Sequence, residues 1–417
     1  MKASYRRIDI SPPIGIRLGG YAHRLGKPST KIHDPLYSRL LYISDNKEDI
    51  LIIQSDLLGI YKKDANYIKK KIHEKTGLSI ENIFLTTIHS HSSPETIIPM
   101  WPNTFPYTRN EEILFEKWWN ETIEKIVNAS EEVINNPSYF RVMYGVFKVE
   151  NLCVNRTFGE NGFKDENLYT LLFYNNDKRI FLLNYACHPV CNTDMGISAD
   201  YPGAIHRYLI EKGFETIFII GSAGDINPLK KGREYIEYMG RRISNTVLNN
   251  INGMKNLDQS NLSIIENDIV FPFRQVNAEN PKRRFEEVYR ECIDKLDDPE
   301  CIVKLLYADE EYEISKRNEK EKRTIIHAFK IGDVMFLTVP GELFAEIDSK
   351  IRKFLSRNGI KLSIVSNYSE DYIGYIPTVE AFRNNKYEAR LARWSRVTID
   401  AEKIFLEETK SLVKELL

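Results

Sequence analysis

Residues 82–95 read NIFLTTIHSHSSPE, an apolar run that passes into a loop carrying two histidines. Residues 82–88 are rich in β-branched and apolar side chains, which predicts a buried strand, and the Ser-Ser-Pro that follows is expected to end it. Because residues i and i+2 of a strand point to the same face, His89 and His91 are predicted to project together from the strand end. Open α/β sheets place their ligands at such strand ends.

This pair of histidines has two interpretations. On an exposed strand edge it is often only a solvated pair. Alternatively, the two rings stay neutral or share a metal ion, because two charged imidazoles side by side repel each other. The chain has only eight histidines in 417 residues. A metal site needs more ligands than these two, so the rest of the chain must supply them.

The composition is that of an ordinary globular protein, with 42% hydrophobic and 28% charged residues. The 58 basic and 59 acidic side chains give a net charge of −1, which predicts no nucleic-acid partner. Residues 1–24 lack the apolar core of a signal peptide, and no apolar run approaches the ~20 residues that span a bilayer. We therefore expect a cytoplasmic protein without stable membrane insertion, and the sequence leaves homo-oligomerisation open.

The five cysteines are an odd number without paired zinc-finger spacing, so we expect no disulfide framework. Cys187 and Cys191 flank His188 in ACHPVC, which resembles a metal knuckle. We do not favour that interpretation, because no second cysteine pair completes such a site.

Strand-like runs alternate with helical patterns through the first two-thirds of the chain, which predicts an α/β protein with strand ends leading into polar loops. The helical patterns lie at 63–77, 110–136 and 200–213. Residues 277–322 differ, because they are dense in charge and helical in pattern. We interpret them as a solvated helical insertion into a single domain of 1–417, with a lid over the site as the alternative.

Further polar motifs lie at the ends of other strand-like runs. His188 ends FLLNYACH, Glu342 follows FLTVPG, and a Gly-rich turn in GSAGDINP carries Asp225 and Asn227. A fourth motif, SNYSEDYIGYIPT, is rich in tyrosine and contains Tyr368, Tyr372 and Tyr375. Each motif alone also has a structural explanation, such as a satisfied core histidine or a helix start. Together, histidines plus one carboxylate form the ligand set of a catalytic zinc, which keeps one position open for water.

Taken in order, these motifs resemble the neutral/alkaline ceramidase family of zinc-dependent amidases, in its catalytic domain only. The resemblance covers most of the chain. It takes in DISPPIGIRLGGYA (9–22), HDPLYSRLL (33–41), HSHSSPE (89–95), NRT (155–157), NYACHPV (184–190), SADYPG (198–203), GSAGDINP (221–228), PGE (340–342) and SNYSEDYIGYIPTVEAF with YEA (366–389). The resemblance implies an α/β fold with a ceramidase-like mixed β-sheet core flanked by helices and a metal site at strand ends.

The resemblance also implies roles for particular residues. The zinc ligands carried over to this sequence are His89, His188, Glu342 and Tyr375. The second histidine of the pair, His91, takes the place of the catalytic acid/base group. Arg156 in NRT and Tyr387 in YEA take the places of groups that bind the amide and the developing oxyanion.

Other positions are open or depart from the family. Asp56 and Asp225 are candidates to orient metal-bound histidines, and both are equally explained as turn or capping residues. Asn227 stands where the family has a serine, so a seryl mechanism at that position is excluded. A zinc-activated water is compatible with this change.

The sequence thus predicts a zinc-dependent hydrolase that cleaves a linear N-acyl or N-acetyl amide of a small molecule by metal-activated water. The alternatives on the same site are a ceramidase proper, a zinc esterase and a sugar N-deacetylase. A non-catalytic metal-containing binding protein is the alternative of another class. Asn227 favours that last alternative, whereas His91 argues against it, because a binder has no need for an acid/base group.

Overall fold

Three larger β-sheets, taken in turn along the chain, form the centre of the protein. The computed structural model describes residues 1–258 and 261–417. The first sheet comprises β1 (Lys2–Asp9), β3 (Tyr37–Ser44), β4 (Asp49–Ser55), β5 (Ile83–Thr87) and β6 (Ser138–Tyr139). The second comprises β7 (Arg141–Lys148), β9 (Asn167–Tyr174), β10 (Arg179–Tyr185), β12 (Glu215–Ile220) and β14 (Lys255–Asn256). The third comprises β15 (Leu262–Pro272), β16 (Glu321–Ile331), β17 (Val334–Thr338) and β19 (Leu362–Ser366).

Each of these sheets is mixed. The strand orders are β5-β4-β3-β1-β6, β12-β10-β9-β7-β14 and β15-β16-β17-β19. Neighbouring strands run antiparallel except for one parallel pair in each sheet, namely β4 with β5, β10 with β12 and β17 with β19. Strands of a parallel pair are usually buried on both faces, and all five residues of β5 are indeed buried. The predicted mixed α/β class is confirmed.

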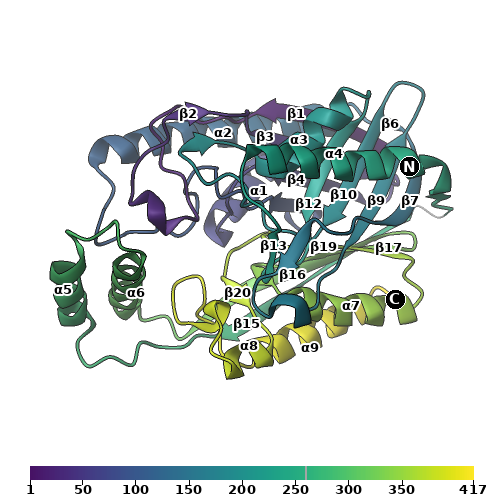
Figure 1. Ribbon diagram of the computed structural model, residues 1–417. Coiled ribbons are helices and arrows are strands. Elements are labelled where there is room, and N and C mark those ends of the chain that lie inside the picture. The colour runs from purple at the N-terminus through teal and green to yellow at the C-terminus, as the bar shows by residue number, and fades with distance from the viewer. Residues whose placement is uncertain (259–260) are drawn as a thin grey trace.

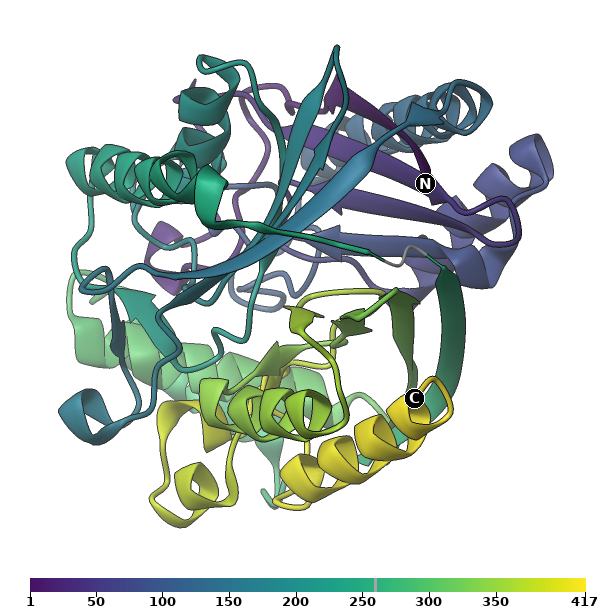
Figure 2. The ribbon, with the colours of Figure 1, turned by 90° about the vertical axis from the view of Figure 1, so that its right-hand side faces the viewer.

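The three sheets share one apolar core, and helices cover their outer faces. Phe84 of the first sheet, Phe173 and Ile219 of the second, and Phe329 and Ile364 of the third belong to one buried cluster. Figure 2 shows the three sheets arranged around this common centre. The helices are α1 (Lys62–Thr76), α2 (Arg109–Asn135), α3 (Asp200–Ile210), α4 (Arg233–Asn250), α5 (Pro281–Cys292), α6 (Pro299–Ser315), α7 (Ala345–Arg357), α8 (Val379–Arg383) and α9 (Ala401–Lys414), as Figure 1 shows.

Helix pairs are distributed among the sheets. Helix α2 packs on the first sheet with α1 beside it, α3 and α4 pack on the second, and α7 and α9 pack on the third. The helical patterns at 63–77, 110–136 and 200–213 correspond to α1, α2 and α3. Helix α1 ends at Gly77, whose φ of 77° is the left-handed conformation that glycine adopts without strain. Within residues 1–258 and 261–417, no helix combines the length and the apolar character needed to cross a membrane.

Short strands in the loops beyond the sheets position the polar motifs. They are β2 (Lys31–Ile32) with β11 (Gly196–Ile197), β8 (Cys153–Asn155) with β13 (Ile226–Pro228), and β18 (Glu342–Leu343) with β20 (Tyr375–Ile376). The β18–β20 pair is parallel, and its register places Glu342 directly beside Tyr375. Two motifs far apart in sequence are thereby fixed next to each other.

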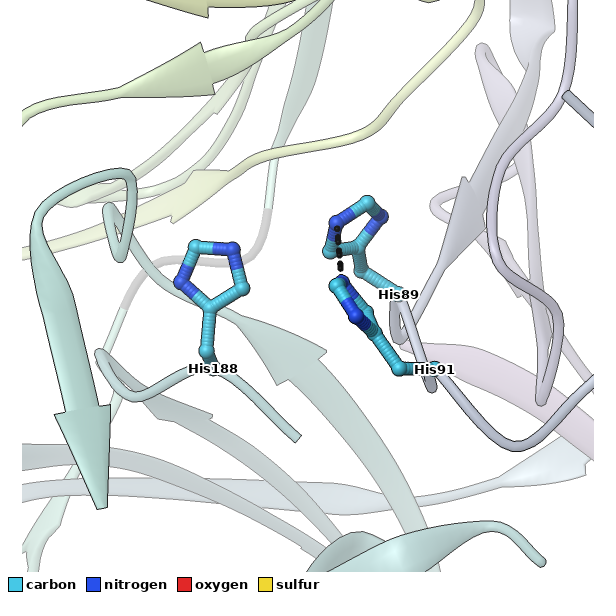
Figure 3. A group of neighbouring side chains, drawn as sticks. All are labelled: His89, His91 and His188. Atoms are coloured by element: carbon cyan, nitrogen blue, oxygen red, sulfur yellow. Dashed lines mark hydrogen bonds between the residues drawn. The ribbon is translucent and has the colours of Figure 1, made fainter. Parts of the chain in front are cut away.

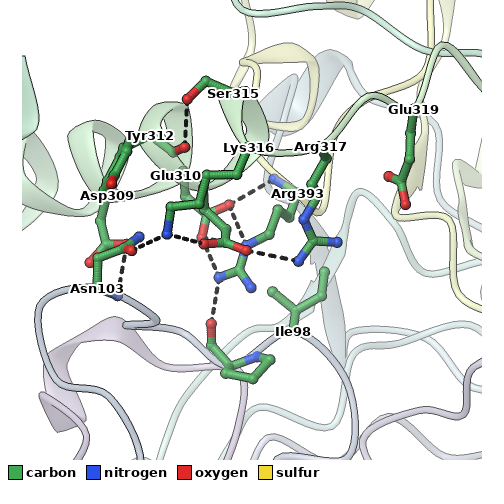
Figure 4. Close-up of polar contacts among 12 residues, drawn as sticks. Ile98, Asn103, Asp309, Glu310, Tyr312, Ser315, Lys316, Arg317, Glu319 and Arg393 are labelled. Atoms are coloured by element: carbon green, nitrogen blue, oxygen red, sulfur yellow. Dashed lines mark hydrogen bonds and ion pairs between the residues drawn. The ribbon is translucent and has the colours of Figure 1, made fainter. Parts of the chain in front are cut away.

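The charged insertion connects two paired strands, β15 and β16, and contains α5 and α6. Its second helix does not fit the expected solvated insertion, because Asp309 and Glu310 of α6 are fully buried. Asp309 accepts hydrogen bonds from the Asn103 side chain at 2.7 Å and from the backbone N–H of Thr104 at 2.8 Å. Glu310 pairs with Arg393 at 2.6 Å. Helical periodicity does not reveal the burial of these two carboxylates, because their partners lie in loops that are far away in sequence (Figure 4).

Candidate metal centre

The two histidines of the opening motif lie in the loop that follows β5. Strand β5 ends at Thr87, and His89 has a φ of 60°, so neither histidine continues the strand. The prediction that they share one strand face is therefore wrong in its geometry. The turn at His89 nevertheless brings the rings together, and His91 Nε2 lies 3.2 Å from His89 Nε2.

His188 and Glu342 reach the same point from the other two sheets. His188 follows β10 of the second sheet. Glu342, the first residue of β18, follows β17 of the third sheet. His188 Nε2 lies 3.0 Å from Glu342 Oε2, and His89 Nε2 lies 3.7 Å from the same oxygen. The three side chains are almost completely buried. Loops after one strand of each sheet therefore converge on a single site.

Nitrogen atoms of His89, His91 and His188 all lie within 4.8 Å of one another (Figure 3). His91 is thus as close to the cluster as the histidines expected to be ligands. The geometry alone allows His91 to act as a third nitrogen ligand or as a group beside the metal. This choice is testable, because a ligand holds the metal and an acid/base group does not.

Hydrogen bonds at Nδ1 fix the ring orientation of His89 and His188, the two histidines expected to be ligands. His89 Nδ1 lies 2.6 Å from the carbonyl oxygen of Leu58, and His188 Nδ1 lies 3.3 Å from that of Ile226. A carbonyl oxygen only accepts, so these contacts favour the proton on each Nδ1, and each Nε2 would then offer its lone pair to a bound metal. Two such lone pairs and a buried carboxylate are a donor set that a divalent metal fits. His91 Nδ1 is buried without a hydrogen-bond partner in the described part of the chain.

The charges of the cluster follow from burial and proximity. Burial lowers the pKa of His89 to about 4 and also lowers the pKa of His91 and His188. Burial would raise the pKa of Glu342, but His89 and His188 more than offset this effect and hold the pKa at about 2. The cluster therefore consists of neutral imidazoles around one carboxylate, the protonation states in which these groups bind metals.

Two tyrosines that the sequence motif contained, but to which no role was given, contact Glu342. Tyr368 donates to Glu342 Oε2 at 3.1 Å, and Tyr372 donates to Oε1. Burial raises the pKa of both phenols, which keeps them protonated as donors. Tyr375 lines the same cavity, together with both histidines of the pair. The abundance of tyrosine in this segment was the one sequence feature that indicated such contacts. It did not show which of the three tyrosines contact Glu342.

Arg156 and Tyr387 both lie beside Tyr375, and Tyr387 also lines this cavity. Arg156 donates from Nη2 to the Tyr375 hydroxyl at 2.8 Å and from Nε to the buried Glu388 at 2.9 Å. It also donates from Nη1 to Asn227 Oδ1 at 3.4 Å, so Asn227 is part of the same network. Tyr387 is half exposed and meets the Tyr375 ring edge-on with centroids 6.1 Å apart. Of these residues, Tyr375 and Tyr387 line the cavity at the cluster.

The two aspartates considered as orienting groups contact other partners. Asp56 accepts from Arg39 at 2.7 Å and from the backbone N–H of Tyr37 at 2.9 Å. Asp225 accepts from the backbone N–H of Ala345, the first residue of α7, and from the side chain of Asn155. Neither carboxylate contacts a histidine of the cluster in the described residues. Asp225 caps the start of α7, whereas Asp56 forms a buried ion pair with Arg39. The five cysteines are buried free thiols.

Comparison with known proteins identifies the fold. No family model and no curated protein matches the chain by sequence. A structure of neutral ceramidase from Pseudomonas aeruginosa superposes with a TM-score of 0.78 at 17% identity, over 100% of this chain and 74% of that chain. A structure described as ceramidase complexed with C2 gives a TM-score of 0.75 at 15% identity, over 100% of this chain and 75% of that chain. The predicted ceramidase-like fold is therefore confirmed.

Proposed function

We propose that this protein is a zinc-dependent amidohydrolase that cleaves a linear N-acyl or N-acetyl amide of a small molecule. The observation that carries the proposal is the convergence of His89, His188 and Glu342, buried and brought from three separate sheets. The ceramidase-like fold supports it, because both structures compared above are described as ceramidases.

In this proposal His89, His188 and Glu342 hold the metal. Tyr375, whose role as a fourth ligand stays a prediction, lies in register with Glu342. When bound, zinc supplies a nucleophile at neutral pH by lowering the pKa of a coordinated water to about 7, and it polarises the carbonyl. The protein's part is to keep both Nε2 lone pairs directed inward, which the carbonyls of Leu58 and Ile226 do.

His91 is assigned the proton transfer. Its ring lies in the same cavity as Glu342 and Tyr375, and its Nε2 is directed at the cluster. A histidine in this place receives the proton released when water attacks the carbonyl and delivers it to the leaving amine. The amide C–N bond breaks, and the products are a carboxylate and an amine.

Arg156 and Tyr387 are assigned the stabilisation of negative charge on the carbonyl oxygen. Glu388, Asn227 and the carbonyl of Gly224 fix the guanidinium from three sides, so it needs little reorganisation when charge develops. Tyr387 is half exposed and lines the cavity, which supports a role as a hydrogen-bond donor to the substrate.

The size of the site supports a small substrate. The cavity at the cluster has a volume of only about 50 Å³. Pockets that bind drug-sized ligands have volumes of about 300–1,000 Å³, so the cavity at the cluster by itself accommodates little more than the reacting amide. We accordingly propose that a water-soluble N-acyl compound is preferred to a long-chain ceramide.

Metal content and activity together test the proposal. Protein purified without added metal should contain about one zinc per chain by elemental analysis. Removal of zinc with a chelator should abolish hydrolysis of acetylated amino sugars, N-acyl amino acids or a short-chain ceramide, and added zinc should restore it. Full activity of the zinc-free protein would refute the metal mechanism, and a clear preference for ceramide would refute the substrate assignment.

A further inference from the structure

A second, larger cavity adjoins the metal centre. Its volume is about 430 Å³, and its wall shares Ile98 and Tyr372 with the cavity at the cluster. The Tyr372 hydroxyl bonds to Glu342, while the same side chain lines the second cavity. One aromatic side chain thus lies between this cavity and Glu342, so the two cavities are direct neighbours.

Basic side chains dominate the lining of this cavity, which we call the cationic pocket. They come from four segments, namely the start of α1, the loop after α6, the start of β16 and the loop before α9. Glu319 is the only acidic residue of the lining in the described part of the chain. The basic residues are Lys62, Lys63, Arg317, Lys322, Arg393 and Arg396.

Carboxylates outside the lining hold several of these cations in place. Glu310 pairs with Arg393 at 2.6 Å, Glu313 with Arg317 at 3.1 Å and Asp371 with Lys322 at 3.0 Å. Figure 4 shows Arg393 and Arg317 with Glu310 behind them. None of the three carboxylates lines the pocket. The charged insertion, from which Glu310, Glu313 and Arg317 come, therefore builds one wall of the pocket.

The remaining cations leave the pocket with an excess of positive charge. Arg396 pairs with Glu319 within the lining, and Lys62 lies 3.9 Å from Asp268. Lys63 has no ion-pair partner within 4.0 Å among residues 1–258 and 261–417. Ion pairs thus offset the charge of the other five basic side chains, and Lys63 adds a further cation. A concave site with an excess of one sign of charge attracts and concentrates ligands of the opposite sign.

We propose that the cationic pocket binds an anionic group of the substrate, a carboxylate or a phosphate, while the scissile amide lies at the metal centre. This inference rests on the proposed function and narrows its substrate class to N-acyl compounds that carry an acidic group. An apolar acyl chain is a poor occupant of the pocket, because it would desolvate several charged groups without pairing them.

Binding tests the pocket independently of catalysis. Acetate and inorganic phosphate are titrated calorimetrically into the zinc-loaded protein and into the variants Lys63→Gln and Arg317→Gln. We expect one of the two anions to bind, and each variant to weaken that binding by about fivefold or more. Lys70→Gln is the matched control, because Lys70 is an exposed lysine on α1, about 10 Å along the helix from Lys63. It should bind like wild type. Unaltered binding in both pocket variants overturns the proposal.

Catalysis tests which anion is used. N-acetyl-β-alanine, its neutral carboxamide and N-acetylaminoethyl phosphate present the same acetamide with a carboxylate, no charge or a phosphate. We expect kcat/KM for one anion to exceed that for the carboxamide by about tenfold or more, the worth of a charge-assisted hydrogen bond. The double variant Lys63→Gln/Arg317→Gln should lose this preference and hydrolyse the anionic substrate no faster than the carboxamide.

The outcomes separate the two proposals. Equal hydrolysis of all three substrates by wild type overturns the anion pocket and leaves the amidase assignment standing. If no amide is hydrolysed by the zinc-loaded protein, the proposed function fails, and the anion titrations still decide whether the pocket binds anions.

Discussion

The ring of Tyr368 stacks on the imidazole of His89, with centroids 3.9 Å apart and planes inclined by 11°. The hydroxyl of the same tyrosine lies 3.1 Å from Glu342 Oε2 and 3.2 Å from His188 Nε2. One fully buried side chain therefore contacts all three groups that we assign to the metal. Tyr368 therefore restricts the orientation of His89, His188 and Glu342 at once.

Replacing Tyr368 with Phe should weaken zinc binding while the fold is retained. Phenylalanine keeps the stacked ring on His89 but removes the hydroxyl that orients Glu342. Loss of a group that orients metal ligands typically costs 10–100-fold in affinity. Competition with a chromogenic chelator measures the change. Tyr185→Phe is the control, since it also removes a buried hydroxyl, one that contacts the Val149 carbonyl at 3.1 Å. Equal zinc affinity of Y368F and wild type would contradict the role.

His91 and His89 should respond differently to substitution with alanine. His91→Ala is expected to retain zinc and to lose about 10²–10⁴-fold in turnover, the usual contribution of a positioned acid/base group. His89→Ala is expected to lose the metal. Elemental analysis and kinetics on the same preparations decide between these roles. Loss of zinc from both variants would instead make His91 the third nitrogen ligand, which its position in the histidine cluster allows.

The pair formed by Glu310 and Arg393 should be important for stability. Both side chains are buried, and the guanidinium also donates to the Pro99 carbonyl. Glu310→Ala leaves Arg393 as an uncompensated buried charge, which typically costs about 3–5 kcal/mol. Urea denaturation should show this loss. Removing one partner of the exposed pair Lys70 and Glu74 should have no measurable effect. A similarly small loss for E310A would mean that water reaches the buried pair.

Glu95 should make the protein less stable as the pH rises. Burial raises its pKa to about 7, although Met100 N–H, Tyr107 and the nearby Arg17 and Arg393 all favour the charged form. A raised carboxyl pKa stabilises the fold below the unfolded-state value of 4.5, and this contribution is lost as the pH approaches 7.

The variant Glu95→Gln removes this titration. Its free energy of unfolding, relative to that of wild type, should therefore rise between pH 4.5 and pH 7, by at most about 3 kcal/mol. Denaturation curves at several pH values measure the difference. A difference that stays constant over this range would show that Glu95 titrates near its ordinary pKa.

Much of the fold and of the candidate site was predictable from the sequence. The periodicity of residues 63–77 and 110–136 predicted α1 and α2, because one apolar face repeats with the helical period. Polar residues at strand ends indicated a metal site, and the family resemblance of the motifs implied that His89, His188 and Glu342 meet there and that the fold is ceramidase-like. All of these are properties of single elements or of their order along the chain.

Only the tertiary structure decided which side chains touch. The approach of His91 to His89 depends on the turn at His89, with its φ of 60°, and not on strand alternation. The contacts of Tyr368 with the cluster, and the burial of Asp309 and Glu310, depend on loops from different sheets. Periodicity specifies which face of an element is apolar. It does not specify the partner on another element, because that pairing is fixed only when the sheets pack together.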